Sequence, residues 1–268
     1  MRRLVHLSDV HFGAIHPEVV DPLVRSVWSH HPHAVVVSGD LTQRARTAEF
    51  AQAKEFLDAL PAPQIVVPGN HDVPLYNVFD RFWKPLKKYR RYITGDLTPA
   101  YADEEMLILG VNTARSLTIK GGRINHEQIE WVGEQFCAAP ETITKILVTH
   151  HPFDGPETDE RDIVGRARQA IARLSECGAD LLLSGHLHNG QIADTAMRYN
   201  TGTRSPLVVQ AGTATSSRGR GEANSYNMLS IEPGTVLVER YEWQPSAGEF
   251  SRVEHNAFTR TETSWRLV

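Results

Sequence analysis

Acidic and imidazole side chains recur at five places in the first two thirds of the sequence. They lie in the segments Asp9-Val10-His11, Gly39-Asp40, Gly69-Asn70-His71-Asp72, His150-His151 and Gly185-His186-Leu187-His188. Histidine is the commonest metal ligand in proteins. Mixed Asp, Asn and His ligands without thiolates suit ions such as Mn²⁺, Zn²⁺ or iron. The residue types therefore predict a metal centre.

The spacing within these motifs has a physical reason. Residues two apart in an extended chain point to the same side, so Asp9 and His11 can reach one ion. The two histidines of the last motif can do the same, or a loop can direct them to neighbouring ions. Glycine precedes a candidate ligand at Gly39, Gly69 and Gly185. At these positions it permits the tight turns that bring backbone and ligand close to an ion.

Short apolar runs precede the motifs and predict strands, several of them buried on both faces. These strands are expected at Leu4–Leu7, Ala34–Ser38, Gln64–Val67, Met106–Val111, Lys145–Thr149 and Asp180–Ser184. Helices with an apolar stripe are expected between them, at Pro17–His31, Arg46–Leu60, His126–Cys137 and Val164–Cys177. The alternation favours an α/β fold, in which ligands bind at the carboxyl ends of the strands.

The pattern changes after about residue 190. Strands are expected at Leu207–Ala211, Tyr226–Ile231 and Val236–Trp243, with a hairpin turn at Glu232–Thr235. No long linker or internal repeat separates this part from the rest. We therefore expect one domain over residues 1–268, with residues from about 190 to 268 completing a second sheet. The stretch Thr213–Asn224 is expected to be a mobile loop.

Composition limits the class of protein. The chain has 268 residues, of which 41% are hydrophobic and 22% charged, as in soluble globular proteins. Its formal net charge of −4 argues against nucleic acid as a partner. The basic segment Arg81–Arg91 is expected to be a solvated helix face. No apolar run approaches the roughly 20 residues of a membrane span, and no signal-peptide pattern precedes Leu4, so we expect a cytoplasmic protein without a membrane partner.

The two cysteines, Cys137 and Cys177, are too far apart in sequence to form a close-spaced metal pair. Nothing in the sequence indicates a disulfide framework. Both are expected in helices, as small buried or half-buried side chains.

Each motif taken alone has an ordinary structural explanation. An aspartate at a strand end is usually a helix cap or a turn former, and a lone histidine usually belongs to the core or the surface. Five such motifs at strand ends, all with ligand chemistry, are poorly explained in that way. We therefore interpret them together, as parts of one site.

The order of the motifs from Asp9 to His188 resembles the signature of calcineurin-like metallophosphoesterases. The resemblance implies a four-layer αββα sandwich, in which two mixed β-sheets are flanked by helices, and a site for two metal ions. By position, the ligands of one ion would be Asp9, His11, Asp40 and His188, and those of the other Asp40, Asn70, His150 and His186. His71 matches a histidine that binds no metal, and Asp72 is placed to orient its imidazole.

The resemblance also implies a mechanism. Two divalent ions roughly 3.5–4 Å apart, Mn²⁺, Fe²⁺/Fe³⁺ or Zn²⁺, activate a shared water, and the bridging hydroxide attacks phosphorus in line with the leaving group. His71 would protonate the leaving oxygen or stabilise charge on the phosphoryl group. No nucleophilic Ser or Cys motif is evident, so no covalent intermediate is required.

Details of the motifs narrow the substrate. Pro68 and Asp72 differ from the arginine and glutamate at these places in protein phosphatases of the superfamily. His71 stands where the lipid-precursor pyrophosphatases have arginine, and the chain leaves little room for the capping domain of the DNA-repair nucleases. The compact chain and its segments Leu7–His11 and Thr149–Pro152 look most like those of bacterial class III cyclic nucleotide phosphodiesterases. This similarity implies a small phosphodiester substrate, with 3',5'-cyclic nucleotides as candidates, and a homodimer.

Several alternatives stay open at this point. The chain could be a broad-specificity phosphatase or a nuclease of the same superfamily. A non-catalytic scaffold usually loses ligands that this chain keeps. Arg44 and Arg115 are candidates for phosphate contact, with a surface salt bridge as the alternative for each. His151 is expected to hold the loop of His150, and no role is assigned to His16 or Asn189.

Overall fold

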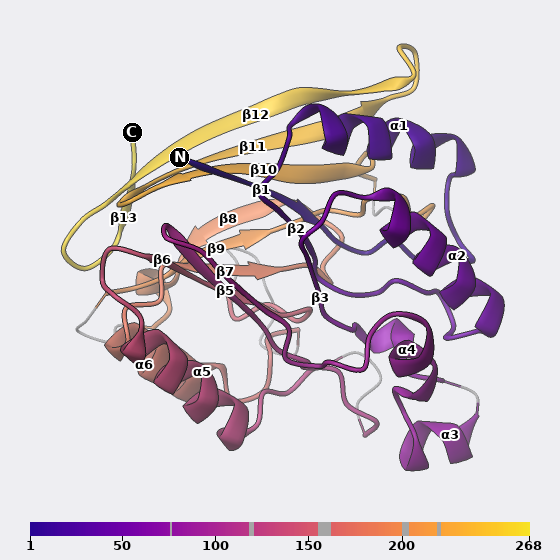
Figure 1. Cartoon of the computed structure of the whole chain (residues 1–268), viewed down its shortest axis with the longest axis horizontal. Coiled ribbons are helices and arrows are strands. Elements are labelled where there is room, and N and C mark those ends of the chain that lie inside the picture. The colour runs from indigo at the N-terminus through magenta and orange to yellow at the C-terminus, as the bar shows by residue number, and fades with distance from the viewer. Residues whose placement is uncertain (76, 118–120, 155–161, 200–203, 219–220) are drawn as a thin grey trace.

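The computed structural model describes residues 1–75, 77–117, 121–154, 162–199, 204–218 and 221–268. Two β-sheets stack face to face, and helices cover their outer faces (Figure 1). This arrangement confirms the predicted αββα sandwich. Every strand and long helix expected before residue 190 is present, within a few residues of its predicted ends.

The first sheet joins the amino-terminal strands to the carboxyl-terminal ones. Its seven strands lie in the order β13-β12-β11-β10-β1-β2-β3. Their bounds are β1 Arg2–Leu7, β2 Ala34–Val37, β3 Gln64–Val66, β10 Ser225–Glu232, β11 Thr235–Gln244, β12 Glu249–Arg260 and β13 Trp265–Leu267. Strands β1, β2 and β3 are parallel, whereas β10 to β13 are antiparallel. The hairpin predicted at Glu232–Thr235 joins β10 to β11.

The second sheet has six strands in the order β4-β5-β6-β7-β9-β8. Their bounds are β4 Ala100–Ala102, β5 Met106–Gly110, β6 Thr144–Val148, β7 Leu181–Ser184, β8 Gln191–Asp194 and β9 Leu207–Gln210. The central strands β5, β6, β7 and β9 run parallel. Residues after 190 thus divide between the sheets, with β8 and β9 in this one and β10 to β13 in the first. That residues 1–268 form a single domain stays a prediction.

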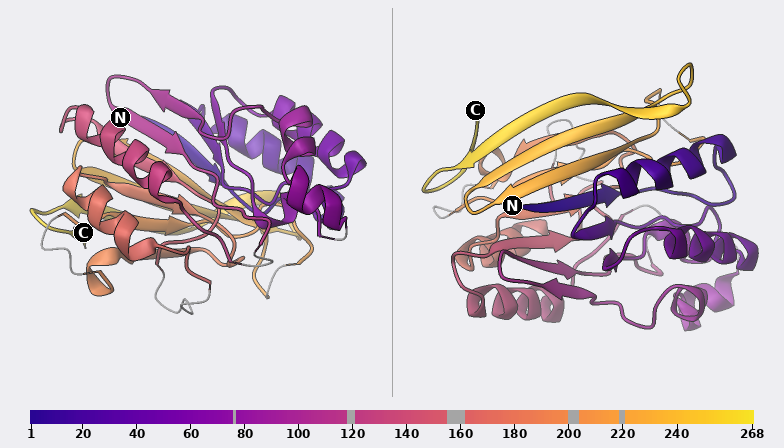
Figure 2. Two further views of the ribbon diagram at one scale, coloured as in Figure 1. Left: turned by 90° about the horizontal axis from the view of Figure 1, so that it is seen from below. Right: turned by 45° about the horizontal axis from the view of Figure 1, so that its top comes forward.

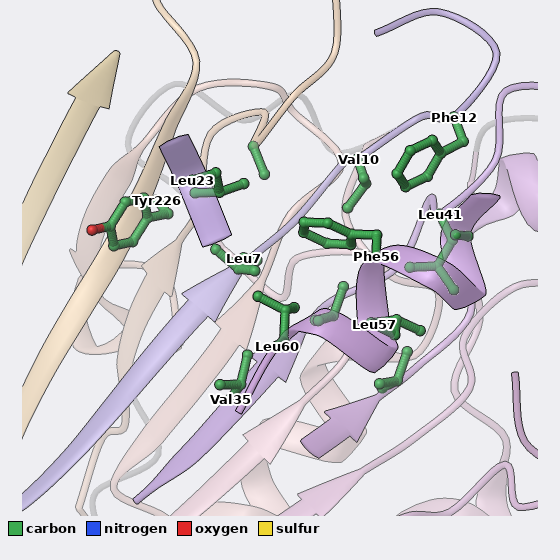
Figure 3. Packing of buried hydrophobic residues seen from close by; sticks show 14 of the residues in the cluster. Leu7, Val10, Phe12, Leu23, Val35, Leu41, Phe56, Leu57, Leu60 and Tyr226 are labelled. Carbon is green, nitrogen blue, oxygen red and sulfur yellow. The ribbon is translucent and has the colours of Figure 1, made fainter. Parts of the chain in front are cut away.

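Helices pack on both outer faces because each has one apolar stripe. The helices α1 (Pro17–Ser29) and α2 (Thr47–Ala59) cover the first sheet, and α5 (His126–Ala138) and α6 (Ala167–Glu176) cover the second (Figure 2). In Figure 3, Leu23 of α1 and Phe56 of α2 lie near Leu7 of β1 and Val35 of β2. This packing fixes the strands of the first sheet from outside.

The strands alternate between two apolar layers. In β1, Val5 and Leu7 face α1 and α2, whereas Leu4 faces the second sheet. In β2, Val35 and Val36 divide in the same way. A strand with apolar side chains on both faces holds its register firmly, because a slip by one residue would exchange the two faces. The ends of β1 and β2, where the motifs begin, are therefore well fixed.

Several elements have no clear signal in the sequence. They are β4, β8, β12, β13, the short helices α3 (Val78–Trp83) and α4 (Lys87–Tyr92), and the 3₁₀ turns η1 (Asn70–Asp72) and η2 (Thr195–Met197). The segment Arg81–Arg91 is not one solvated helix, because it splits around Pro85. Arg81 is buried, and its guanidinium donates to the carbonyls of Ser116 and Pro74. In the described parts of the chain, no helix has the length and apolarity needed to span a membrane.

The expectation of unpaired cysteines is wrong. Cys137 lies in α5 and Cys177 ends α6, as predicted, but their sulfur atoms form a disulfide. The two helices pack side by side on the second sheet, so residues 40 apart in sequence have Cα atoms 4.5 Å apart. Sequence spacing carries no information about such a contact between helices.

One buried histidine makes the stability of the fold sensitive to acid. His6 of β1 is fully buried, and its Nε2 lies 2.9 Å from Ser38 Oγ. Burial lowers the pKa of His6 to about 3, against the opposing effect of Asp9. Below pH 6.5 the unfolded chain takes up a proton at this histidine that the folded protein does not bind, so stability falls as the pH falls.

We therefore expect His6→Gln to reduce the loss of stability in acid. Between pH 7 and pH 5, the wild type should lose about 2 kcal/mol more free energy of unfolding than the variant. Urea unfolding at both pH values measures this difference. In the control variant His126→Gln, which changes a histidine whose side chain is 78% exposed, the loss should equal that of the wild type. Equal losses in His6→Gln and the wild type would contradict the prediction.

Candidate metal centre

The five motifs meet at one end of the sandwich. Asp9 follows β1, Asp40 follows β2, Asn70 follows β3, His150 follows β6 and His186 follows β7. These strands run parallel within their sheets, so their carboxyl ends lie at the same edge. The structure thereby brings together side chains that are far apart in sequence, such as Asp9 and His188.

A first group of side chains consists of Asp9, His11, Asp40 and His188. All four are buried, and their ligand atoms lie within 4.8 Å of one another. His11 Nε2 lies 3.5 Å from Asp9 Oδ1 and 3.6 Å from Asp40 Oδ2. His188 Nε2 lies 3.3 Å from both Asp9 Oδ1 and His11 Nε2. These are the four residues predicted for one ion.

A second group surrounds His150. Its Nε2 lies 3.4 Å from Asp40 Oδ2, 3.1 Å from Asn70 Oδ1 and 3.3 Å from His186 Nδ1. The Nδ1 atom of the same ring donates to the carbonyl of Ser38 at 2.7 Å, which turns Nε2 toward the group. The carboxylate of Asp40 lies between the two groups, as the predicted shared ligand would.

The atoms of the first group fit a cation. Asp9 Oδ1 is buried and accepts no hydrogen bond from any described residue. Its partner oxygen, Oδ2, accepts from Ser8 Oγ at 2.6 Å and from the backbone N–H of His186 at 2.9 Å. A buried carboxylate oxygen without a donor is costly unless a positive charge lies beside it. Facing imidazole nitrogens and this oxygen together form a suitable set of metal ligands.

The electrostatics of the site also favour a cation. Asp9 and Asp40 are buried, and their only ion-pairing partners among the described residues are histidines. Burial by itself would raise the pKa of Asp40, but the imidazole of His150 and its neighbours hold it well below the ordinary range. Burial lowers the pKa of His150, but Asp40 outweighs this and raises it to about 9. The surroundings of Asp40 therefore favour a positive charge beside its carboxylate.

The candidate ligands are held in an unusual backbone conformation. Asp9, His11, Asp40, His186 and His188 have φ of 52°, 56°, 54°, 75° and 64°, the left-handed region that residues other than glycine rarely adopt. Only three other non-glycine residues in the described chain have positive φ, so the strain is concentrated at the site. The expectation that an extended chain aligns Asp9 with His11 is wrong. Both reach the first group because each residue turns back sharply.

The histidines of the last motif illustrate the same point. His188 belongs to the first group and His186 to the second. The loop therefore directs the two imidazoles to neighbouring positions, the second of the two possibilities that the spacing left open.

Two of the glycines are required by close approach. A Cβ atom at Gly69 would lie 2.1 Å from Asp40 Oδ1, and one at Gly185 would lie 1.8 Å from Ser8 Oγ. Neither has positive φ, so space rather than backbone conformation excludes a side chain. Any larger residue would displace the carboxylates of the site.

His71 lies beside the two groups, and its orientation differs from the expectation. Its backbone N–H donates to Asp40 Oδ1 at 2.8 Å, and its Nδ1 donates to the carbonyl of Gln43 at 2.8 Å. Asp72 accepts instead from Thr42 N, Thr42 Oγ1, Leu41 N and Gly69 N. The Gln43 carbonyl therefore orients the imidazole, and Asp72 ties the turn η1 to the loop after β2.

Two other residues considered in the sequence, His151 and Arg115, make contacts typical of structural residues. His151 Nδ1 lies 2.9 Å from Thr113 Oγ1, as for a structural residue, yet its ring lies close enough to His150 and His186 to form a group of possible ligands. The guanidinium of Arg115 donates to Gln128 Oε1 and to the carbonyl of Asn112. These bonds stabilise the loop after β5. Arg115 is half-buried, and these hydrogen-bond partners are neutral, so the contacts are not the surface salt bridge expected as the alternative to phosphate contact.

The loop after β9 contributes residues that the motifs did not indicate. The expectation of a mobile loop is wrong for its first four residues, because Thr213–Ser216 is buried. Residues 219 and 220 of that stretch lie outside the described residues. Ala214 N donates to the carbonyl of Ser8, and Thr215 Oγ1 donates to that of Val10. The carbonyl of Arg218 accepts from His188 Nδ1 at 3.3 Å. One feature could have indicated this loop: it follows β9, which runs parallel to β7, so it starts at the same edge of the sheet as the loop of His186 and His188.

Comparison with known proteins agrees with this geometry. The family model of the calcineurin-like phosphoesterases matches residues 2–190. A glycerophosphodiester phosphodiesterase, GpdQ of Enterobacter lignolyticus, is 26% identical over 201 residues, which are 69% of this chain and 70% of that protein. The 3',5'-cyclic adenosine monophosphate phosphodiesterase CpdA of Escherichia coli is 24% identical over 257 residues, which are 88% of this chain and 84% of that protein.

Solved structures share the fold at low sequence identity. The purple acid phosphatase PPD1 of yellow lupin superposes with a TM-score of 0.72 at 12% identity, over 94% of this chain. The match covers 52% of the lupin protein, so this chain spans about half of its length. Vacuolar protein sorting 29 of Cryptosporidium parvum gives a TM-score of 0.52 at 13% identity, over 97% of this chain and 98% of that one. The family match over most of the chain places it in the calcineurin-like phosphoesterase family of metal-dependent phosphoester hydrolases.

Proposed function

We propose that the chain hydrolyses small phosphodiesters at a centre of two metal ions. The observation that carries the proposal is the position of Asp40. Its Oδ2 lies 3.6 Å from His11 Nε2 and 3.4 Å from His150 Nε2, so one carboxylate oxygen faces both groups. In this proposal one ion is held by Asp9, His11, Asp40 and His188, and the other by Asp40, Asn70, His150 and His186.

The bound ions and the chain have separate tasks. Two divalent ions, of Mn²⁺, iron or Zn²⁺, would lower the pKa of water at the centre and offset charge on the phosphoryl group. Asp40 keeps the two positions adjacent. The Ser38 carbonyl fixes the ring of His150, and the Arg218 carbonyl fixes that of His188, since each binds the ring nitrogen that faces away from its group. Such contacts to metal-binding histidines set their orientation.

His71 is the proposed proton donor. Its Nδ1 is committed to the Gln43 carbonyl, so Nε2 is the atom that can meet a leaving oxygen. When protonated, Nε2 donates to the oxygen that departs from phosphorus, and the proton moves with the new alcohol. Burial lowers the pKa of His71, and Arg218 lowers it further, while Asp40 acts in the opposite sense.

The substrate class rests on two observations. Two of the relatives are named as phosphodiesterases, one for glycerophosphodiesters and one for cyclic adenosine monophosphate. Pro68 precedes Gly69, where an arginine would suit a dianionic monoester. Cyclic nucleotides are thus candidate substrates, as are open-chain diesters. A homodimer and a cytoplasmic location stay predictions.

Asp40→Asn should abolish hydrolysis and lower the metal content below two ions per chain. The substitution removes the charge that both cations share, so holding them close together costs more energy. Elemental analysis and turnover of bis(p-nitrophenyl) phosphate measure the two effects. Asp58→Asn, which changes an exposed carboxylate on α2, should match the wild type in both. Near-normal turnover with two metals in Asp40→Asn would refute the ligand assignment, and a wild type without metal after metal-supplemented purification would favour a non-catalytic scaffold.

Diesters should be better substrates than monoesters. With Mn²⁺ present, we expect faster cleavage of bis(p-nitrophenyl) phosphate than of p-nitrophenyl phosphate at equal concentration. The reason is the proline before Gly69, since a dianion needs more cationic partners than a monoanion. The initial rates of p-nitrophenolate release decide the matter. A monoester rate several times higher would favour a phosphatase.

His71→Ala should retain both metals but lose turnover, by roughly 10²–10⁴-fold if proton donation is the lost contribution. The loss should be large for a cyclic nucleotide, whose leaving ribose oxygen needs a proton. It should be smaller for bis(p-nitrophenyl) phosphate, whose leaving group is stable as an anion.

Metal content and rates on both substrates test this expectation. Loss of one metal would make His71 a ligand. Equal losses of rate on the two substrates would favour stabilisation of charge on the phosphoryl group over proton donation.

A further inference from the structure

Arg218 places an exposed cation beside His71 of the candidate centre. Its Nη1 lies 3.4 Å from His71 Nε2 and 3.4 Å from Gln43 Oε1. Both distances are long for hydrogen bonds from a guanidinium. Arg218 is exposed and forms no ion pair with a carboxylate in the described chain. A guanidinium has five N–H donors, so most of its binding capacity is unused.

The backbone of Arg218 is held by the residues that build the centre. Its carbonyl accepts from His188 Nδ1, and its N–H donates to Ser216 Oγ at 3.1 Å. The preceding residue, Ser217, donates its N–H to the carbonyl of Ala14 at 2.9 Å. The start of this side chain is therefore fixed relative to the candidate ligands. Binding through a fixed residue costs less conformational entropy than binding through a loose one.

The hydrogen bond between Arg218 Nη1 and His71 Nε2 is long, so a charged acceptor could replace it. The guanidinium is positively charged, and the imidazole presents Nε2 toward it. An oxyanion placed between them would accept from the guanidinium in its preferred short geometry. A phosphate ester, the proposed substrate of the metal centre, carries such oxygens.

We propose that Arg218 is a substrate-binding residue that holds a non-ester oxygen of the phosphodiester beside His71. On binding, Nη1 leaves its long contacts with Gln43 and His71 and donates to the phosphoryl oxygen. This inference rests on the proposed function. The guanidinium can donate two parallel hydrogen bonds to a phosphate, which a lysine cannot reproduce.

Arg218→Gln removes the charge and keeps a polar side chain. We expect kcat/KM for bis(p-nitrophenyl) phosphate to fall roughly 10- to 100-fold, mainly through KM, as for loss of a hydrogen bond to a charged group. Calorimetry should show a similar loss in the affinity of the metal-loaded protein for inorganic phosphate. The metal content should stay that of the wild type. Arg218→Lys should recover only part of the loss, because the lysine ammonium restores the charge but not the two parallel N–H donors of the guanidinium.

Arg266→Gln is the matched control, because it makes the same change of charge at an exposed position of β13. It should leave KM and phosphate affinity unchanged. Unchanged KM and phosphate affinity in Arg218→Gln would overturn the proposal, and so would a loss of metal or a fall in kcat alone. If the wild type binds metal but cleaves no phosphodiester, the proposed function fails, while the phosphate titrations still decide whether Arg218 binds an oxyanion.

Discussion

The burial of two carboxylates, Asp9 and Asp40, is the constraint on which the site depends. Neither has a lysine or arginine partner among the described residues, and Asp9 Oδ1 accepts no hydrogen bond there. Burying an ionised carboxylate is costly unless a positive charge lies beside it. The histidines around both residues provide that charge as imidazolium ions, or else provide ligand nitrogens that hold metal cations. The arrangement is therefore stable only with protons or metal ions bound, and this links the electrostatics of the fold to its chemistry.

The sandwich meets this constraint at the cost of local strain. Five candidate ligands have left-handed backbone conformations, each costing on the order of 1–3 kcal/mol. Such strain persists only where surrounding structure fixes the chain, and here three apolar layers do so. The strands that precede the ligands are buried on both faces, so neither their register nor their ends can shift easily. The rigid strand ends thus hold Asp9 and Asp40 in backbone conformations that a free loop would not adopt.

The sequence predicted the architecture because ligand motifs follow apolar runs whose pattern is local. The strands before Asp9, Asp40 and His150 could be located from such runs, and parallel pairing then brings their ends together. Contacts between distant loops leave no such pattern. The Gln43 carbonyl orients His71, but a backbone carbonyl has no sequence signature. Arg218 occupies no motif, and its place depends on the course of the loop after β9. The Cys137–Cys177 disulfide likewise depends on how α5 and α6 pack.

The site is graded from a buried inner part to an open outer part, and the two parts are built differently. Asp9, His11 and Asp40 are at most 1% exposed and held by strand ends, whereas His71 is half-buried and Arg218 is exposed. Ligand geometry tolerates little change, because Gly69 and Gly185 leave no room for a side chain beside the carboxylates. The outer residues lie on turns and loops that can vary without disturbing the two sheets. The two residues that we propose to meet the substrate, His71 and Arg218, thus belong to the part of the site that the core constrains least.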